Sequence, residues 1–220
     1  MTLKQYILKH FRHGEIFTVS DLAASGKSRT SICTELSNMK KKSFVQKYEK
    51  GAYYIPATST IFGILPPEQK QVISYICRKY DGYPTGHAAY NQMHLTEQVP
   101  TKVQIATTKK VSNSGMKHIT FTKARISPKN KDITLLQTLD AITNIKKIHG
   151  KTPAESIERI TLHIKSKSPV QKQLLVHYAI QYPPRTRYIL SGILIESGET
   201  TLGKELKTTL NPTTRFNHAY

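Results

Sequence analysis

The sequence contains no tryptophan, only two cysteines and only 14 acidic residues among its 220. No stretch approaches the roughly 18 uncharged apolar residues that a membrane-spanning helix needs, and the first residues lead into a polar helix pattern without the apolar core of a signal peptide. We therefore expect no membrane partner and a cytoplasmic location. Cys33 and Cys77 both lie in segments with helical apolar periodicity, which predicts two buried free thiols and excludes a zinc finger.

The motifs of common enzymes are also missing. The chain has no Walker-type glycine-rich loop, no HExxH, no GxSxG and no acidic cluster with the spacing of metal ligands. The scattered acidic residues give poor support for two-metal nuclease chemistry. His87, His94 and His118 fall in three different predicted elements and read as ordinary histidines. We expect no catalytic residue, no metal site and no cofactor.

Basic residues, in contrast, are abundant. The 33 lysines and arginines give a formal net charge of +19 and a pI near 9.9. The excess is spread along the chain, with +6 in residues 1–60, +7 in residues 61–130 and +6 in residues 131–220. Hydrophobic residues make up 38% of the chain, which is enough for a folded core. A folded protein with this charge is expected to bind a polyanion.

Residues 1–56 follow the order of a winged helix-turn-helix domain. A first helix begins near Leu3 and stops at His13-Gly14, and Ser20 is a candidate N-cap for a short helix over residues 21–25. Ser28 is the candidate N-cap of a longer helix whose apolar stripe is Ile32, Leu36 and Met39. Two strand-like runs, residues 44–48 and 52–55, then predict a hairpin behind a helix-turn-helix unit.

The remaining residues, 57–220, are predicted to form a second domain, so that the whole chain belongs to the α+β class. Residues 57–130 are expected to be mixed α/β, with helices over 68–80 and 86–93. The segments 103–108 and 117–122 are expected to pair as a second β-hairpin through a turn at 112–115. Residues 131–220 read as mostly helical. Thr152 and Glu155 form a capping-box pattern, and the helix after Ser168 is predicted to bury Val170, Leu174 and Tyr178.

The second helix of the predicted helix-turn-helix has a polar face opposite Ile32. Helical geometry places small hydrogen-bonding side chains and one cation on this face, which is the kind of surface that a recognition helix turns toward the major groove. Basic residues at the start of this helix and at the hairpin tip suit phosphate contacts. The candidate DNA-binding residues are Lys27, Ser28, Arg29, Thr30, Thr34, Ser37, Lys41, Lys47 and Lys50. The alternative is a solvated helix face.

Lysines around the second predicted hairpin are candidates for further phosphate contacts that extend the DNA footprint. They are Lys102, Lys109, Lys110 and Lys117, with Lys123 nearby. The alternative is that these lysines protect an exposed sheet edge against aggregation.

Several local motifs resemble the AbiEi-type antitoxins of bacterial type IV, or abortive-infection, toxin–antitoxin systems. They are Gly-Lys-Ser-Arg at residues 26–29, the segments 50–56 and 62–67, Tyr-Pro-Thr-Gly-His-Ala-Ala-Tyr-Asn at 83–91, Leu-Thr-Glu-Gln-Val-Pro at 95–100 and Leu-Asn-Pro at 210–212. Together these motifs span most of the chain. Residues 91–94 read Asn-Gln-Met-His where the family usually has an Asn-Leu-Gly-type turn.

The resemblance implies an autorepressor whose winged helix binds inverted repeats in its own promoter. It also implies that the C-terminal part counteracts a cognate nucleotidyltransferase-like toxin, directly or functionally. The partners expected are thus double-stranded operator DNA, bound by a dimer or by two monomers, and that toxin. Two alternatives stay open: a winged-helix regulator without a toxin partner, and an RNA-binding protein.

Overall fold

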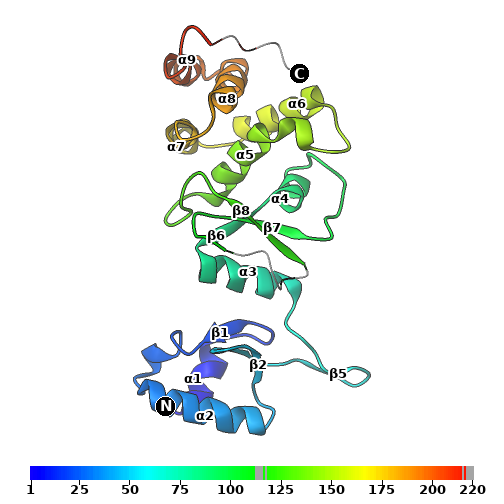
Figure 1. The fold of residues 1–220 in the computed structure, drawn as a ribbon, viewed down its shortest axis with the longest axis vertical. Helices are drawn as coiled ribbons and strands as arrows, with labels where there is room; N and C mark the ends of the chain where they lie inside the picture. The colour runs from blue at the N-terminus through cyan, green and yellow to red at the C-terminus, as the bar shows by residue number, and fades with distance from the viewer. Residues whose placement is uncertain (112–115, 117, 215, 217–220) are drawn as a thin grey trace. The chain divides into compact units, whose positions relative to one another are not determined.

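The computed structural model describes residues 1–111, 116, 118–214 and 216, and contacts within it divide the chain into two compact units. The N-terminal unit comprises Met1–Arg78 and the C-terminal unit Lys79–Tyr220 (Figure 1). The chain is of mixed α and β structure, as expected. The functional boundary predicted after residue 56 stays a prediction, whereas the compact N-terminal unit itself continues through Arg78.

The N-terminal unit combines short helical segments with a small antiparallel sheet. Its sheet has the strand order β1-β3-β2, and β4 pairs with β5 in a separate two-stranded ribbon. The elements are α1 (Leu3–His10), β1 (Ile16–Thr18), the 3₁₀ turn η1 (Ala23–Ser25), α2 (Arg29–Lys41), β2 (Gln46–Glu49), β3 (Ala52–Tyr54), β4 (Thr58–Ser59), β5 (Gly63–Ile64) and most of α3 (Gln69–Tyr80).

Local sequence signals explain the helices of this unit. Thr2 and Gln5 form a capping box at the start of α1, and the Ser28 side chain accepts a hydrogen bond from the Ser31 amide at the start of α2. The predicted helix capped by Ser28 and the hairpin of β2 and β3 are confirmed. The core of this unit is formed by the buried side chains of Leu3, Ile7, Phe17, Leu22, Ile32, Leu36, Val45 and Ile55.

The structure of this unit differs from what the sequence predicted in two places. Residues 21–25 do not form an α-helix capped by Ser20; only the single turn η1 is present, and the Asp21 carboxylate accepts hydrogen bonds from the amide and hydroxyl of Thr18 instead. Residues 16 and 17, which lie between the two predicted helices, belong to strand β1, which pairs with β3. A run of three residues is too short for its periodicity to identify a strand.

The C-terminal unit joins a three-stranded sheet to a group of helices. Its elements are β6 (Gly82–Thr85), α4 (His87–Gln92), β7 (Val103–Thr107), β8 (Ile119–Lys123), α5 (Ile133–Thr143), the 3₁₀ turn η2 (Ile145–Lys147), α6 (Pro153–Lys165), α7 (Pro169–Ala179), α8 (Pro184–Glu196) and α9 (Thr200–Thr208). Helix α5 packs against β6 and α4 on one side and against α7 and α8 on the other, so it joins the sheet to the helices (Figure 1).

The second predicted hairpin is wrong. β7 and β8 run parallel, with Val103 opposite Ile119 and Thr107 opposite Lys123, and parallel neighbours cannot be joined by a tight turn. The expected turn at 112–115 lies outside the described residues. β7 pairs antiparallel with β6. This strand was not predicted, because it contains Gly82 and Pro84, and both residue types are unusual within a strand. Because β6 is an edge strand, Pro84 is tolerated there.

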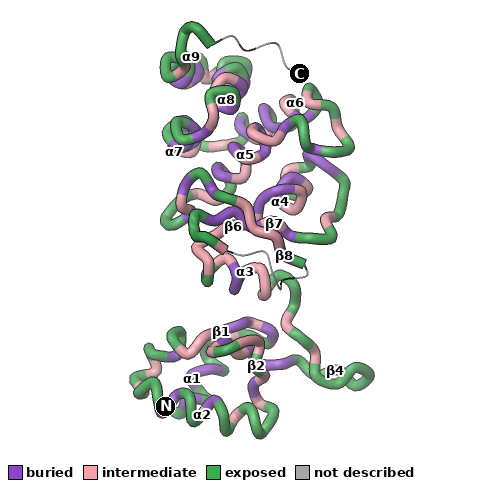
Figure 2. Tube along the Cα trace, viewed as in Figure 1, coloured by how far each residue is buried: buried purple, intermediate pink, exposed green. Residues whose placement is uncertain are grey.

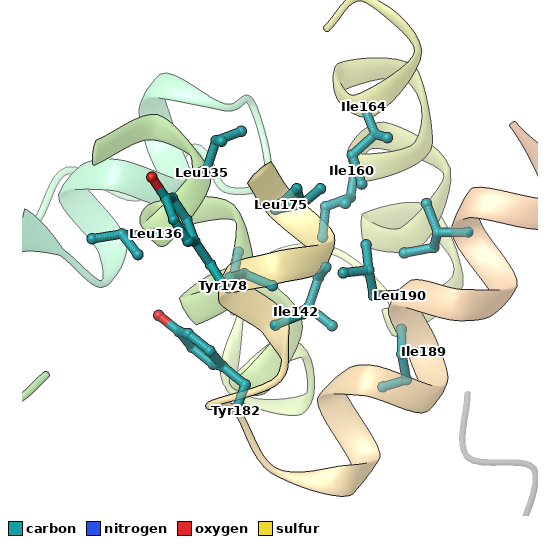
Figure 3. Close-up of a cluster of buried hydrophobic side chains, with 14 of the residues drawn as sticks. Leu135, Leu136, Ile142, Ile160, Ile164, Leu175, Tyr178, Tyr182, Ile189 and Leu190 are labelled. Atoms are coloured by element: carbon teal, nitrogen blue, oxygen red, sulfur yellow. The ribbon is translucent and has the colours of Figure 1, made fainter. Parts of the chain in front are cut away.

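The helices α5 to α9 surround the larger core, part of which is drawn in Figure 3. The capping boxes at Thr152 and Ser168 are confirmed. The predicted stripe of α7 is confirmed for Tyr178, which is buried, but it is wrong for Val170 and Leu174, which are exposed; the buried side includes Leu175 and Val176 instead. Helix α9 was not predicted. It approaches α8 at Gly203, where a Cβ atom would lie 2.8 Å from the Ser191 carbonyl oxygen.

Both cysteines are free, but the expectation that both are buried is wrong for Cys33. Cys33 follows Ile32 directly, and one residue along a helix turns the side chain by about 100°, out of the core. Cys77 is half-buried, and burial raises the pKa of its thiol to about 11. Among the described residues, no helix has both the length and the apolar composition of a membrane span.

Candidate nucleic-acid interface

The outer face of α2 is polar, basic and exposed. Ile32 and Leu36 point into the core and are almost completely buried, so that the opposite side of the helix faces solvent (Figure 2). The exposed residues of the helix are Arg29, Thr30, Cys33, Thr34, Ser37, Asn38, Lys40 and Lys41. Five of the predicted contact residues, Arg29, Thr30, Thr34, Ser37 and Lys41, thus lie on one exposed side. Sequence reasoning missed Cys33 and Asn38 on it.

The exposed face of α2 carries no carboxylate. Glu35 is the single acidic residue of the helix, and it is only half exposed. The Lys27 ammonium donates to Glu35 Oε1 at 2.7 Å, and the Ser31 hydroxyl donates to the same oxygen at 3.2 Å. The hydrogen bond from Lys27 is the main reason that the pKa of Glu35 is lowered. Lys27 is therefore already paired, whereas Arg29 carries a cation on the exposed surface.

Two of the predicted hydroxyl contacts are partly used within the helix. The Ser28 oxygen accepts from the Ser31 amide, which leaves its proton available for an outside acceptor. The Thr34 hydroxyl donates to the Thr30 carbonyl oxygen at 3.1 Å. The other predicted side chains of the outer face donate no hydrogen bond to a group of the helix in the part of the chain that the structure describes. They are Arg29, Thr30, Ser37 and Lys41.

The hairpin of β2 and β3 presents two further cations. Lys47 lies in β2 opposite Tyr53, and Lys50 lies in the short connection between the strands, and both are exposed. Between them, Glu49 accepts a hydrogen bond from the Tyr75 hydroxyl of α3, which anchors β2 to that helix. The hairpin thus carries exposed lysines on a strand pair that is attached to the rest of the unit.

The lysines proposed for a second contact are not gathered in one place. Lys102 precedes β7, whereas Lys109 and Lys110 follow it, so about 20 Å of extended strand separates them. Lys117 lies outside the described residues. Lys123, at the end of β8, is paired in register with Thr107 and therefore lies near Lys109. A groove of about 600 Å³ is lined there by residues 107–111 and 121–123.

The metal-binding side chains do not gather in this interface. Within the described part of the chain, no three residues of the types His, Cys, Asp and Glu lie close enough together to hold a metal ion.

Comparisons with known proteins identify the family. The model of a family of unknown function matches residues 4–173, which is more than half of the chain. The chain belongs to DUF6088. The matched segment of this DUF6088 chain includes the whole N-terminal unit after Leu3 and ends within α7, before α8 and α9. A search of the curated proteins gave no match.

One solved structure was also found to be similar. It is the crystal structure of the RV2827C protein from Mycobacterium tuberculosis, with 11% sequence identity and a TM-score of 0.49. The similarity covers 96% of this chain and 81% of that protein.

Proposed function

We propose that this chain is a winged helix-turn-helix protein that binds double-stranded operator DNA through α2 and the β2–β3 hairpin. The observation that supports this proposal is the outer face of α2, where Arg29 and Lys41 are exposed beside hydroxyl groups with no carboxylate among them. A major groove about 12 Å wide admits one α-helix, and donors on its outer face can reach base edges. The order of helix, strand, 3₁₀ turn, helix and hairpin in this unit also supports the proposal of a winged helix.

The distribution of charge supports phosphate contacts on both sides of the inserted helix. Lys47 and Lys50 of the hairpin supply cations for one flanking backbone, and the amides of the first turn of α2 together with Arg29 supply donors for another. Such contacts position the protein, while Thr30 and Ser37 are the short side chains available for base edges.

We further propose that the protein represses its own promoter and counteracts a cognate nucleotidyltransferase-like toxin in the cytoplasm. This part rests on the resemblance of its motifs to AbiEi-type antitoxins. The binding unit acts on inverted repeats as a dimer or as two monomers, because a helix-turn-helix reads half-sites spaced by whole turns of DNA.

Cys33 provides a direct test of the interface, because it lies in the middle of the outer face of α2. The full chain is labelled with a thiol-reactive maleimide, with and without a duplex of its upstream DNA, and the rate at each cysteine is followed by mass spectrometry. We expect the duplex to slow labelling of Cys33 severalfold. Cys77 is the internal control, because its half-buried thiol has a raised pKa. Equal rates at Cys33 with and without bound DNA would exclude this face.

A matched pair of arginine variants tests the same surface by affinity. Arg29→Ala should weaken binding by about 1–3 kcal/mol if the guanidinium reaches a base edge. Arg12→Ala removes the same charge from an exposed position after α1 and should have a much smaller effect. With about five to eight phosphates neutralised, log K should fall with log salt concentration with a slope of about −4 to −7. A flat salt response would contradict nucleic-acid binding altogether.

Co-expression separates the antitoxin from a regulator without a toxin partner. The full chain and its Arg29→Ala variant are each expressed with the neighbouring downstream gene, and growth is scored. We expect both to rescue growth, because toxin control is assigned to the C-terminal part. Failure of both to rescue would favour a regulator alone.

Stronger binding to double-stranded RNA than to DNA would favour the RNA alternative, although the deep and narrow major groove of RNA does not admit a helix.

A further inference from the structure

The C-terminal unit contains a pocket of about 350 Å³ that the DNA-binding proposal does not use. Its lining comes from segments far apart in sequence: the end of β6, α4, β7, the end of β8 and the loop after it, α5 and the residues that follow it, η2, and the loop after α7. Its lining includes Thr85, Gln104, Lys123, Arg125, Asp140, Lys147 and Tyr182. The volume lies at the lower end of the range for small-molecule sites, about 300–1,000 Å³.

A hydrogen-bonded carboxylate forms the floor of the pocket. Asp140 Oδ2 accepts from the Tyr83 hydroxyl at 2.9 Å and from the Thr85 hydroxyl at 2.7 Å, and Oδ1 accepts from the Tyr182 hydroxyl at 3.0 Å. A carboxylate offers about four lone-pair sites. These three bonds leave one site, on Oδ1, for a donor that enters the pocket. Burial raises the pKa of Asp140 despite the three donors.

Three cations surround this carboxylate. Lys123, Arg125 and Lys147 line the pocket and are exposed at its rim. Arg125 is near enough to Asp140 to act on its pKa, but none of the three cations has a carboxylate within 4 Å in the part of the chain that the structure describes. The pocket therefore has three positive charges around the single, half-buried carboxylate of Asp140.

Another wall of the pocket is shaped by the backbone at Gly86, which lies very close to the side chain of Gln104 in β7. Gly86 has a φ angle of +68°, and a Cβ atom there would lie 2.5 Å from Gln104 Oε1. The next residue, His87, also lines the pocket, and its ring stacks on His149 with centroids 5.6 Å apart. Its Nδ1 atom is buried and makes no hydrogen bond to any described residue. This wall thus contains a buried polar atom with no hydrogen-bond partner among the described residues.

We propose that this pocket binds a small phosphate ester that also carries hydroxyl or amino groups, such as a nucleoside monophosphate or a sugar phosphate. The phosphate lies among Lys123, Arg125 and Lys147, and a donor of the same molecule bonds to Asp140 Oδ1. Bare phosphate would bring its charge close to the Asp140 carboxylate, and an uncharged sugar would leave the three cations without an anion. A ligand with both groups satisfies both halves of the pocket.

Calorimetric titration of the full chain tests the proposal with matched probes. The probes are guanosine 5′-monophosphate and ribose 5-phosphate, each with its unphosphorylated counterpart, guanosine or ribose, and inorganic phosphate. We expect at least one phosphate ester to bind at least tenfold more tightly than its counterpart and than inorganic phosphate. Which ester binds more tightly distinguishes a nucleotide from a sugar phosphate. Absence of binding by both esters overturns the proposal.

Two variants locate the site. The double variant Lys123→Ala and Lys147→Ala should weaken ester binding more than tenfold. The control, Lys102→Ala with Lys165→Ala, removes two exposed lysines that do not line the pocket and should change it less than twofold. Asp140→Asn should weaken ester binding while strengthening that of inorganic phosphate, because the repelling charge is gone. Equal losses in both double variants, or parallel changes for ester and phosphate in Asp140→Asn, would overturn the site.

Discussion

The two units differ in where they present their polar groups. In the N-terminal unit the candidate interface is the outer face of a single helix, whose opposite face packs on a small core. In the C-terminal unit the polar groups converge inward from several segments around Asp140, between a sheet and a large helical core. A convex surface of one helix suits a long polymer, whereas a concave site made by several elements suits a small molecule.

This difference makes the consequences of a substitution differ in kind. Residues on the outer face of α2 make few contacts with their own unit, so their replacement should affect binding and spare folding. Asp140 holds Tyr83 and Thr85 of β6 and Tyr182 of the loop after α7 together, so its replacement should affect both.

The largest expected effect separates the two cores. Leu36→Ala in the N-terminal unit and Leu190→Ala in the C-terminal unit should each lower the free energy of unfolding by about 2–5 kcal/mol, because each side chain is fully buried. Amide hydrogen exchange should show the loss of protection mainly in the unit that carries the change. The exposed residues Leu8 and Leu162 provide the controls, with changes within about 0.5 kcal/mol on replacement by alanine. Loss of protection spread equally over both units would contradict the division at Arg78.

The next effect concerns the half-buried carboxylate of Asp140. Asp140→Asn should cost about 1–3 kcal/mol at neutral pH, because at least one of the three hydroxyl donors loses its acceptor. The pKa of Asp140 is raised by burial, so the folded state binds its proton more tightly than the unfolded state does. The carboxyl's contribution to stability is therefore greatest below its ordinary pKa and is lost as pH rises through the folded value. Denaturant unfolding measured at several pH values above the ordinary pKa should show this pH dependence of the free energy of unfolding in the wild type and not in Asp140→Asn. The same pH dependence in both proteins would assign it to another group.

The helix caps should give a smaller and nearly equal effect in the two units. Ser28→Ala removes the N-cap of α2 and Thr152→Ala that of α6, and each should cost about 0.5–2 kcal/mol. Thermal unfolding measures both. Because Ser28 also lies at the candidate interface, only Ser28→Ala should weaken DNA binding as well. Equal DNA affinities of the two variants would remove the Ser28 hydroxyl from the contacts.

The smallest effect concerns the Lys27–Glu35 pair. Because both side chains of the pair remain about one-third exposed to solvent, Lys27→Ala should change stability by only about 0.2–1 kcal/mol. The pKa of Glu35 is lowered mainly by the hydrogen bond from Lys27, so this stabilisation is present above the ordinary pKa of the carboxyl and is lost as pH falls through the folded value. Glu35→Gln should strengthen DNA binding in a gel-shift assay by releasing Lys27, and Lys27→Ala should weaken it less than Arg29→Ala. Weaker binding by Glu35→Gln would show that Glu35 itself orients the interface.

Local signals predicted the N-terminal unit better than the sheet of the C-terminal unit. The cap at Ser28, the stripe of Ile32 and Leu36 and the hairpin after them depend on neighbours a few residues apart, and all are confirmed. The strands 103–107 and 119–123 were recognised, but their relative direction was not, because alternation of side chains is the same in parallel and antiparallel pairs.

The errors in the helices have a similar cause. The apolar residues Val170 and Leu174 defined a stripe on α7 that the fold exposes, and Lys172 lies on the buried side instead. The Lys172 ammonium is paired with Glu199 at 2.8 Å, at the start of α9. A buried cation is tolerated only with such a partner, and a partner 27 residues away cannot be identified from periodicity.

The sequence by itself determined the excess of positive charge, the helix ends and the polar face of α2, because each depends on composition or on residues within one or two turns. It also carries the motif Tyr-Pro-Thr-Gly at residues 83–86 without showing its purpose. Only the tertiary structure decided that Tyr83, Thr85 and Tyr182 meet at Asp140 beneath three cations. Contacts between segments up to about a hundred residues apart arise from the packing of β6 and the loop after α7 on α5, and no local pattern encodes them.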